Sequence, residues 1–159
     1  MLLQIQPKSF AIAYITYVFF SFVIYLITAN TIPAWIVYLF VLAPFYLLCA
    51  AHVISVAWTK RNCSVQLRKN LLWITFVFQG LMIASSPGSC YGVNQGQACY
   101  SFIQALFVDL FTNENLRQFG PNVMHWSYVE SAFPFMVGLY MLSMIFVLGL
   151  LHFVPHANR

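Results

Sequence analysis

The sequence predicts an all-α membrane protein: one domain, residues 1–159, of four transmembrane helices, with a short outer amphipathic helix and both termini in the cytoplasm. Hydrophobic residues make up 62% of the chain and charged residues only 6%, whereas about a quarter of the residues of a soluble domain are charged. So few charges cannot cover a water-exposed surface, but lipid accepts an apolar exterior. Four long apolar runs, and the placement of the basic residues between them, complete the evidence.

The four apolar runs have lengths that suit a bilayer, because a helix of about 20 residues crosses the hydrocarbon core. The run 10–29 has no charge. The run 33–58 is long and holds Pro44 near its middle, so we expect a tilt or a kink. The run 68–86 begins with basic residues that would snorkel to the membrane surface. The run 131–154 completes a four-helix bundle.

The segment 87–130 is the one long stretch that does not span. It opens with turn residues, and apolar residues then recur at helical spacing from Tyr100 to Phe111. This helix is too short to cross a bilayer, so we expect it to lie in the interface or on the mouth of the bundle. The residues on its apolar side are Ile103, Leu106, Phe107, Leu110 and Phe111.

Charge sets the predicted orientation, because loop lysines and arginines mark the cytoplasmic side. All three acids, Asp109, Glu114 and Glu130, fall within 87–130, which we place outside. Arg117 is the one basic residue on that side and can pair with Glu114. The other six lie near the termini or between the second and third runs: Lys8, Lys60, Arg61, Arg68, Lys69 and Arg159.

The cysteines predict one disulfide. Cys90 and Cys99 lie in the outer segment, and a disulfide persists outside the cytoplasm. A redox-active pair would favour the tighter Cys-x-x-Cys spacing. Cys49, within the second run, is expected to pack as a small apolar residue, and Cys63, in the cytoplasmic loop, is expected to be reduced.

Two histidines raise the possibility of a haem site. His52 and His152 lie in the second and fourth runs, which cross in the same direction, so the two side chains would sit at similar depth. A b-type haem needs such a pair on facing helices, and Gly149 would give room for the ring. The alternative is that His52 bonds a neighbouring carbonyl and His152 lies at the headgroups. No metal site is predicted.

Polar residues at the outer mouth form the second candidate site. Asp109, His125 and Glu130 could line an entry for protons or cations. The alternative for Glu130 is that its carboxylate complements the dipole at the start of the fourth helix. Within the third run, Gln79 is expected to bond across helices and Gly80 to permit close approach, with Gly138 in a similar packing role.

The predicted function is that of a non-enzymatic accessory or scaffolding subunit. The sequence has no phosphate loop, zinc spacing or nucleophile elbow, and its net charge of +4 is too scattered to indicate nucleic acid. The lipid bilayer and other membrane subunits, or further copies of the chain, are the expected partners, with the disulfide-linked outer segment as contact surface. The alternatives are a small channel or carrier, and a membrane enzyme or haem electron carrier.

The orientation can be tested at Cys63. We expect a membrane-impermeant thiol reagent, applied outside intact cells, to leave Cys63 unlabelled, because the basic loop that contains it faces the cytoplasm. Labelling after the cells are opened serves as the control. Strong labelling of intact cells would contradict the predicted orientation.

Overall fold

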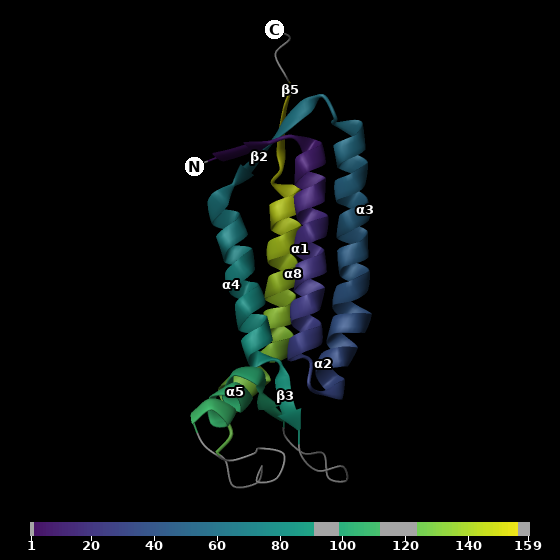
Figure 1. Ribbon diagram of the computed structural model, residues 1–159. Coiled ribbons are helices and arrows are strands. Elements are labelled where there is room, and N and C mark those ends of the chain that lie inside the picture. Colours follow the sequence, from purple (N-terminus) through teal and green to yellow (C-terminus); the bar gives the residue numbers. More distant parts are fainter. Residues whose placement is uncertain (1, 91–98, 112–123, 156–159) are drawn as a thin grey trace.

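The computed structural model describes residues 2–90, 99–111 and 124–155. Glu114, Arg117 and Arg159, which entered the charge argument, lie outside these ranges. The described chain is mostly helical, and its long helices stand side by side as a bundle (Figure 1). In chain order these are α1 (Pro7–Thr28), a continuous helix made of α2 (Ile32–Ile36), η1 (Val37–Leu42) and α3 (Ala43–Thr59), then α4 (Lys69–Ser85) and α8 (Phe133–Gly149).

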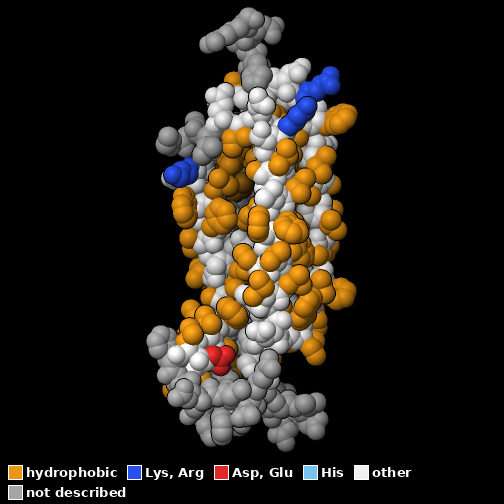
Figure 2. Space-filling model, in the orientation of Figure 1, with side chains coloured by type: hydrophobic (Ala, Val, Ile, Leu, Met, Phe, Trp, Pro, Cys, Tyr) orange, Lys and Arg blue, Asp and Glu red, His pale blue; other side chains and the backbone are white. Residues whose placement is uncertain are grey.

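Two of these helices are long and apolar enough to cross a membrane: α1 and the continuous helix Ile32–Thr59. Only 22% of the most apolar stretch of each is buried, so their apolar side chains mainly face outward. The core helix of a soluble protein would bury them, whereas Figure 2 shows hydrophobic side chains along the sides of the bundle. Helices α4 and α8 have 17 residues each, about 25 Å of helix against a hydrocarbon core of about 30 Å.

The irregularity expected near Pro44 is a π-helical turn. Pro44 has no N–H group and cannot complete a regular helical hydrogen bond. The π-helix η1 ends directly before α3, whose first turn contains Pro44, and its wider turn changes the bonding pattern there. The helix therefore continues through this region without a break.

A three-stranded sheet closes the end of the bundle that carries the basic residues. Strands β1 (Leu2–Ile5) and β5 (His152–Pro155) pair antiparallel with the two edges of β2 (Cys63–Arg68). Val65 and Leu67 on β2 are buried, as expected for a strand with one face on a core. The described basic residues Lys8, Lys60, Arg61, Arg68 and Lys69 lie in or next to β1 and β2, at one end of the molecule, which we call the sheet end (Figure 1).

This sheet changes two sequence predictions. The segment between the second and third helices is expected to be a polar loop, but most of it forms β2. The fourth helix is expected to reach residue 154, but α8 ends at Gly149 because the residues that follow pair with β2. A turn at Ala132 also separates α8 from the short helix α7 (Ser127–Ser131).

The opposite end carries a second small unit. Strands β3 (Pro87–Cys90) and β4 (Cys99–Ser101) form a hairpin, and α5 (Phe102–Phe111) follows directly. The structure thus confirms a short helix in the segment predicted from Tyr100 to Phe111, but the helix begins at Phe102 because Tyr100 and Ser101 belong to β4. We call β3, β4, α5 and residues 124–131, which include α7, the cap.

A hydrogen-bond network lies inside the bundle, with Gln79 of α4 at its centre. The Gln79 side chain accepts a bond from the Tyr17 hydroxyl at 2.8 Å and donates to Ser21 Oγ at 2.9 Å. It also donates to the Tyr25 hydroxyl at 3.1 Å. These three partners all belong to α1, so the prediction that Gln79 bonds across helices is confirmed.

Tyrosine hydroxyls extend this network to the remaining helices. The Tyr140 hydroxyl of α8 lies 2.7 Å from that of Tyr17 and also contacts the hydroxyl of Tyr46 on α3. Tyr46 in turn lies 2.8 Å from the Tyr25 hydroxyl. The side chains of Tyr25, Tyr46 and Tyr140 are almost fully buried. One network therefore joins all four long helices of the described chain.

Glycine contacts do not hold the helices together. A Cβ atom added at Gly80, Gly138 or Gly149 would meet no atom within 4 Å, and all three residues are exposed. The predicted close approaches at Gly80 and Gly138 are therefore wrong. Packing in the described bundle depends on large side chains and on the tyrosine network.

We expect Tyr140→Phe to lower the free energy of unfolding by about 1–3 kcal/mol, because it takes a partner from the partly buried Tyr17 hydroxyl and from the buried Tyr46 hydroxyl. Titration with a denaturing detergent, followed by circular dichroism, measures this. Tyr14→Phe is the matched control: the Tyr14 hydroxyl is buried beside the weakly accepting Cys49 thiol and has no partner with hydrogen-bond geometry. An equal loss of unfolding free energy in Tyr140→Phe and Tyr14→Phe would show that the tyrosine network does not stabilise the bundle.

Candidate functional site

The cap contains the predicted disulfide. Cys90 and Cys99 are bonded, and they face each other as paired residues of the β3–β4 ladder. The bridge therefore fastens the two strands at the end of the hairpin farthest from α4. Residues 91–98, which connect the strands and include Gly92 and Gly96, lie outside the described residues.

The hairpin packs closely on the start of α5. The Phe102 N–H group donates to the Ser86 carbonyl oxygen at 2.6 Å. Gly88 is buried beside it, and an added Cβ atom there would lie 2.5 Å from the Phe102 Cα atom. A residue without a side chain is required at such a backbone approach. The hairpin and α5 are thus held as one unit.

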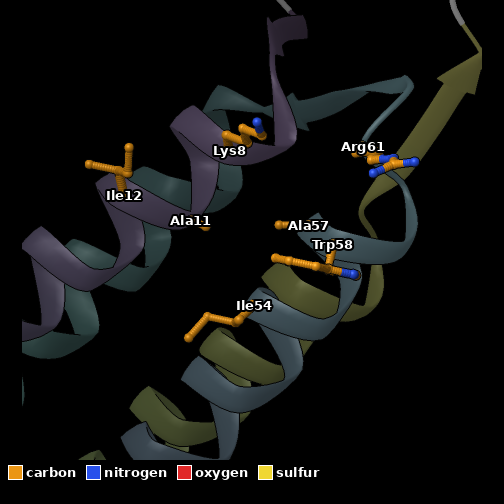
Figure 3. A pocket seen from close by; sticks show the side chains of 7 residues that line it. All are labelled: Lys8, Ala11, Ile12, Ile54, Ala57, Trp58 and Arg61. Carbon is orange, nitrogen blue, oxygen red and sulfur yellow. The ribbon is translucent and has the colours of Figure 1, made fainter.

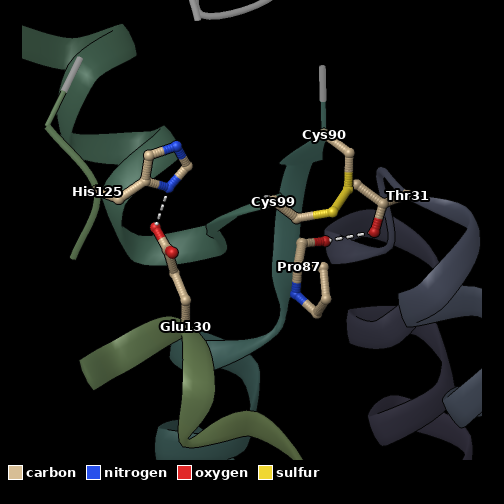
Figure 4. Close-up of a disulfide and its surroundings, with 6 residues drawn as sticks. All are labelled: Thr31, Pro87, Cys90, Cys99, His125 and Glu130. Atoms are coloured by element: carbon tan, nitrogen blue, oxygen red, sulfur yellow. Dashed lines mark hydrogen bonds and ion pairs between the residues drawn. A yellow bond between two sulfur atoms is a disulfide. The ribbon is translucent and has the colours of Figure 1, made fainter. Parts of the chain in front are cut away.

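The turn between the first two long helices fixes the hairpin to the bundle. Thr31 lies in this turn, and its Oγ1 donates to the Pro87 carbonyl oxygen at 2.6 Å (Figure 4). The Thr31 hydroxyl makes no capping bond to its own helix, α2. Thr31 therefore stands in a typical helix-capping position, but its side chain joins the cap to the bundle.

Gln104 holds the segment that leads into α7. This buried side chain of α5 donates from Nε2 to the Met124 carbonyl oxygen at 2.6 Å, and its Oε1 accepts from the Trp126 N–H group at 3.1 Å. The Tyr100 ring stacks on the His125 ring with 4.0 Å between centroids. In the sequence, Gln104 only interrupts an apolar pattern, so its role as a backbone clamp has no local signal.

The structure brings together two of the three residues predicted at the outer mouth. His125 Nδ1 and Glu130 Oε1 lie 2.8 Å apart (Figure 4). Asp109 is exposed on α5 and takes no part in this pair. Glu130 belongs to α7 and not to the first turn of α8, where its carboxylate was expected to complement the helix dipole. Its described partner is the His125 imidazole. Within the described ranges, no three His, Cys, Asp or Glu side chains gather as metal ligands would.

Of the two predicted haem ligands, His52 and His152, the structure describes the side chain of His52. This residue is exposed on α3, and the void that it lines measures about 10 Å³, room for about one water molecule. Ligand pockets for larger molecules hold about 300 Å³ or more. His152 pairs through its backbone with Gln66 in the sheet, and its side chain lies outside the description. The haem site at His52 and His152 therefore stays a prediction.

The cap is rich in exposed apolar and aromatic side chains. Tyr128 of α7 is 91% exposed. The rings of Phe107 and Trp126 lie against each other with 5.9 Å between centroids. The large apolar residues exposed on the cap are Ile103, Leu106, Phe107, Leu110, Met124, Trp126 and Tyr128.

No protein-family model, curated protein or solved structure matches this chain. What the cap can do therefore follows from its own geometry. It is a hairpin closed by a disulfide and followed by two short helices. A hydrogen bond from Thr31 ties it to the bundle, Gln104 holds it together internally, and several of its apolar side chains are exposed. Such an arrangement is suited to binding another surface.

We expect Gly88→Ala to loosen the cap, because the new methyl group would press on the backbone of Phe102. Overpacking of this kind costs about 1–3 kcal/mol, which corresponds to roughly tenfold to hundredfold faster amide exchange where α5 begins. Hydrogen–deuterium exchange of the peptide that contains Phe102 measures it.

Gly80→Ala is the matched control for this substitution, because an added Cβ atom at Gly80 meets open space. We expect unchanged exchange in the cap, since alanine is a better helix former than glycine and Gly80 lies on α4. Equal exchange rates in both variants would show that the approach of Gly88 to α5 does not hold the cap.

Proposed function

We propose that all four long helices cross a membrane, with the sheet end in the cytoplasm and the cap outside. The apolar sides of the bundle support the crossing. The disulfide of the cap supports the orientation, because disulfides persist outside the cytoplasm. Basic residues at the cytoplasmic side support it as well, and those described at the sheet end are Lys8, Lys60, Arg61, Arg68 and Lys69.

Within this membrane placement, the proposed role is that of a non-enzymatic accessory subunit, which packs through the cap against a partner membrane protein. One observation carries this proposal: the exposed apolar side chains of the cap are held on a frame that a disulfide and hydrogen bonds fix. A frame that is fixed in advance lowers the ordering cost of binding. Aromatic and methionine side chains such as those exposed on the cap are also enriched at the centres of interfaces.

The fixed frame favours a protein partner over lipid headgroups alone. A helix that only lies in the membrane interface needs an apolar face and no defined position relative to a bundle. Here the bonds of Thr31 and Gln104 define where the hairpin and α7 lie, and the His125–Glu130 pair braces the residues between them. A fixed position of the cap on the bundle favours binding to a protein, because a protein surface has a fixed shape and lipid headgroups do not.

The tyrosine network weighs against the alternative of a channel or carrier. The hydroxyls of Tyr17, Tyr46 and Tyr140 meet between the helices, and Tyr46 and Tyr140 are almost fully buried. A solute path along the bundle axis would have to part these hydrogen bonds. The network therefore supports a packing role for the bundle.

The proposal is tested by photo-crosslinking in the native membrane. We expect a benzophenone amino acid in place of Tyr128, on the cap, to give a discrete band of higher mass that contains the partner. The same replacement of Phe40 is the matched control: it is also an exposed aromatic residue, but it lies on the continuous helix away from the cap. We expect only lipid adducts from that position.

A second crosslinking position on the cap is needed in case the side chain at position 128 does not reach the partner. Leu110 of α5 is exposed like Tyr128, so we expect it to capture the same partner. If both cap positions yield only the lipid adducts seen at Phe40, the accessory-subunit proposal is wrong. A band that contains two differently tagged copies of this chain would identify the partner as a second copy.

A further inference from the structure

A groove of about 400 Å³ lies between α1 and α3 at the sheet end. Figure 3 shows Ala11 and Ala57 facing each other across it, so two small side chains leave the space between the helices open. Lys8 and Arg61 lie toward the sheet end of the groove, and the remaining lining residues are Ile12, Ile54 and Trp58.

The positive charges at this groove have no described counter-charge. The chain contains three acids in all, and the two that are described, Asp109 and Glu130, belong to the cap at the other end. Lys8 also lies in the first turn of α1, where the helix dipole disfavours a cation. Neither Lys8 nor Arg61 forms an ion pair within the described residues. An anionic ligand would supply the missing charge.

The rest of the groove is apolar and open to the outside. Ile12 is 66% exposed and Trp58 is 80% exposed. Toward the middle of the bundle the walls are Ile12 of α1 and Ile54 of α3. A tryptophan beside basic side chains is typical of the level of the lipid headgroups. The groove thus offers charge at one end and an apolar track at the other.

We propose that this groove binds an anionic phospholipid. Its phosphate lies between Lys8 and Arg61, and one acyl chain runs past Ile12 and Ile54. Basic pockets between helices on the cytoplasmic side of a membrane bind anionic headgroups in this way, and the apolar track favours a lipid over a free phosphate ion. The inference rests on the membrane placement proposed above, and it does not depend on a protein partner at the cap.

Native mass spectrometry of the full chain in mild detergent tests the proposal. We expect dioleoyl phosphatidylglycerol to be retained roughly tenfold more than dioleoyl phosphatidylcholine, and Lys8→Gln with Arg61→Gln to abolish this preference. Arg68→Gln with Lys69→Gln is the matched control, because these two basic residues lie at the sheet end but do not line the groove. The control variant should keep the preference.

A second variant tests the apolar track without changing any charge. We expect Ala11→Phe, which fills the groove, to lower retention of phosphatidylglycerol severalfold, while inorganic phosphate fails to displace the lipid. Displacement by inorganic phosphate would overturn the lipid assignment. Equal retention of the two lipids, or equal loss in the Arg68 and Lys69 control, would also overturn it. Release of the wild-type chain from membranes by alkaline carbonate would instead refute the membrane placement.

Discussion

The hydrogen bonds between Gln79 and the buried tyrosines are the interaction on which the rest of the structure depends. In the proposed membrane placement, apolar helices gain little hydrophobic energy from touching one another, so polar contacts and packing decide which helices associate. The Gln79 side chain can satisfy its bonds only when α1 and α4 stand at one relative height. Tyr140 and Tyr46 extend this constraint to α8 and α3. The helix heights in turn determine where the sheet and the cap form.

The sequence predicted where the helices lie along the chain, but it predicted some of their ends poorly. Long apolar runs locate helices because a bilayer requires a minimum length, and the second run, 33–58, matches the continuous helix Ile32–Thr59. The sheet was missed because β2 pairs with segments that are more than 50 residues away along the chain. Val65 and Leu67 have the alternation of a half-buried strand, but that run is short. The early end of α8 follows from the same missed pairing.

The contacts of the candidate site were predictable where the two partners lie close together in the sequence. Cys90 and Cys99 could be paired because both lie in one short segment, and His125 and Glu130 are five residues apart. Gln104 could not be assigned, because its partners are backbone groups about 20 residues away. The tyrosines were overlooked for another reason: within an apolar run, the sequence does not distinguish a tyrosine on the outside of the bundle from one that faces its axis. Their hydroxyls become informative only when the helices are placed.

The order of the strands in the sheet constrains how the molecule is assembled during synthesis. The middle strand, β2, is made when only two of the long helices exist, and it can pair at once with β1. Its other edge has no partner until α8 has been completed, because β5 follows that helix directly. For that interval β2 presents an open strand edge, which is a template for pairing with another chain. The nascent protein is therefore most exposed to mispairing between the second and the fourth helix, and β5 ends that period.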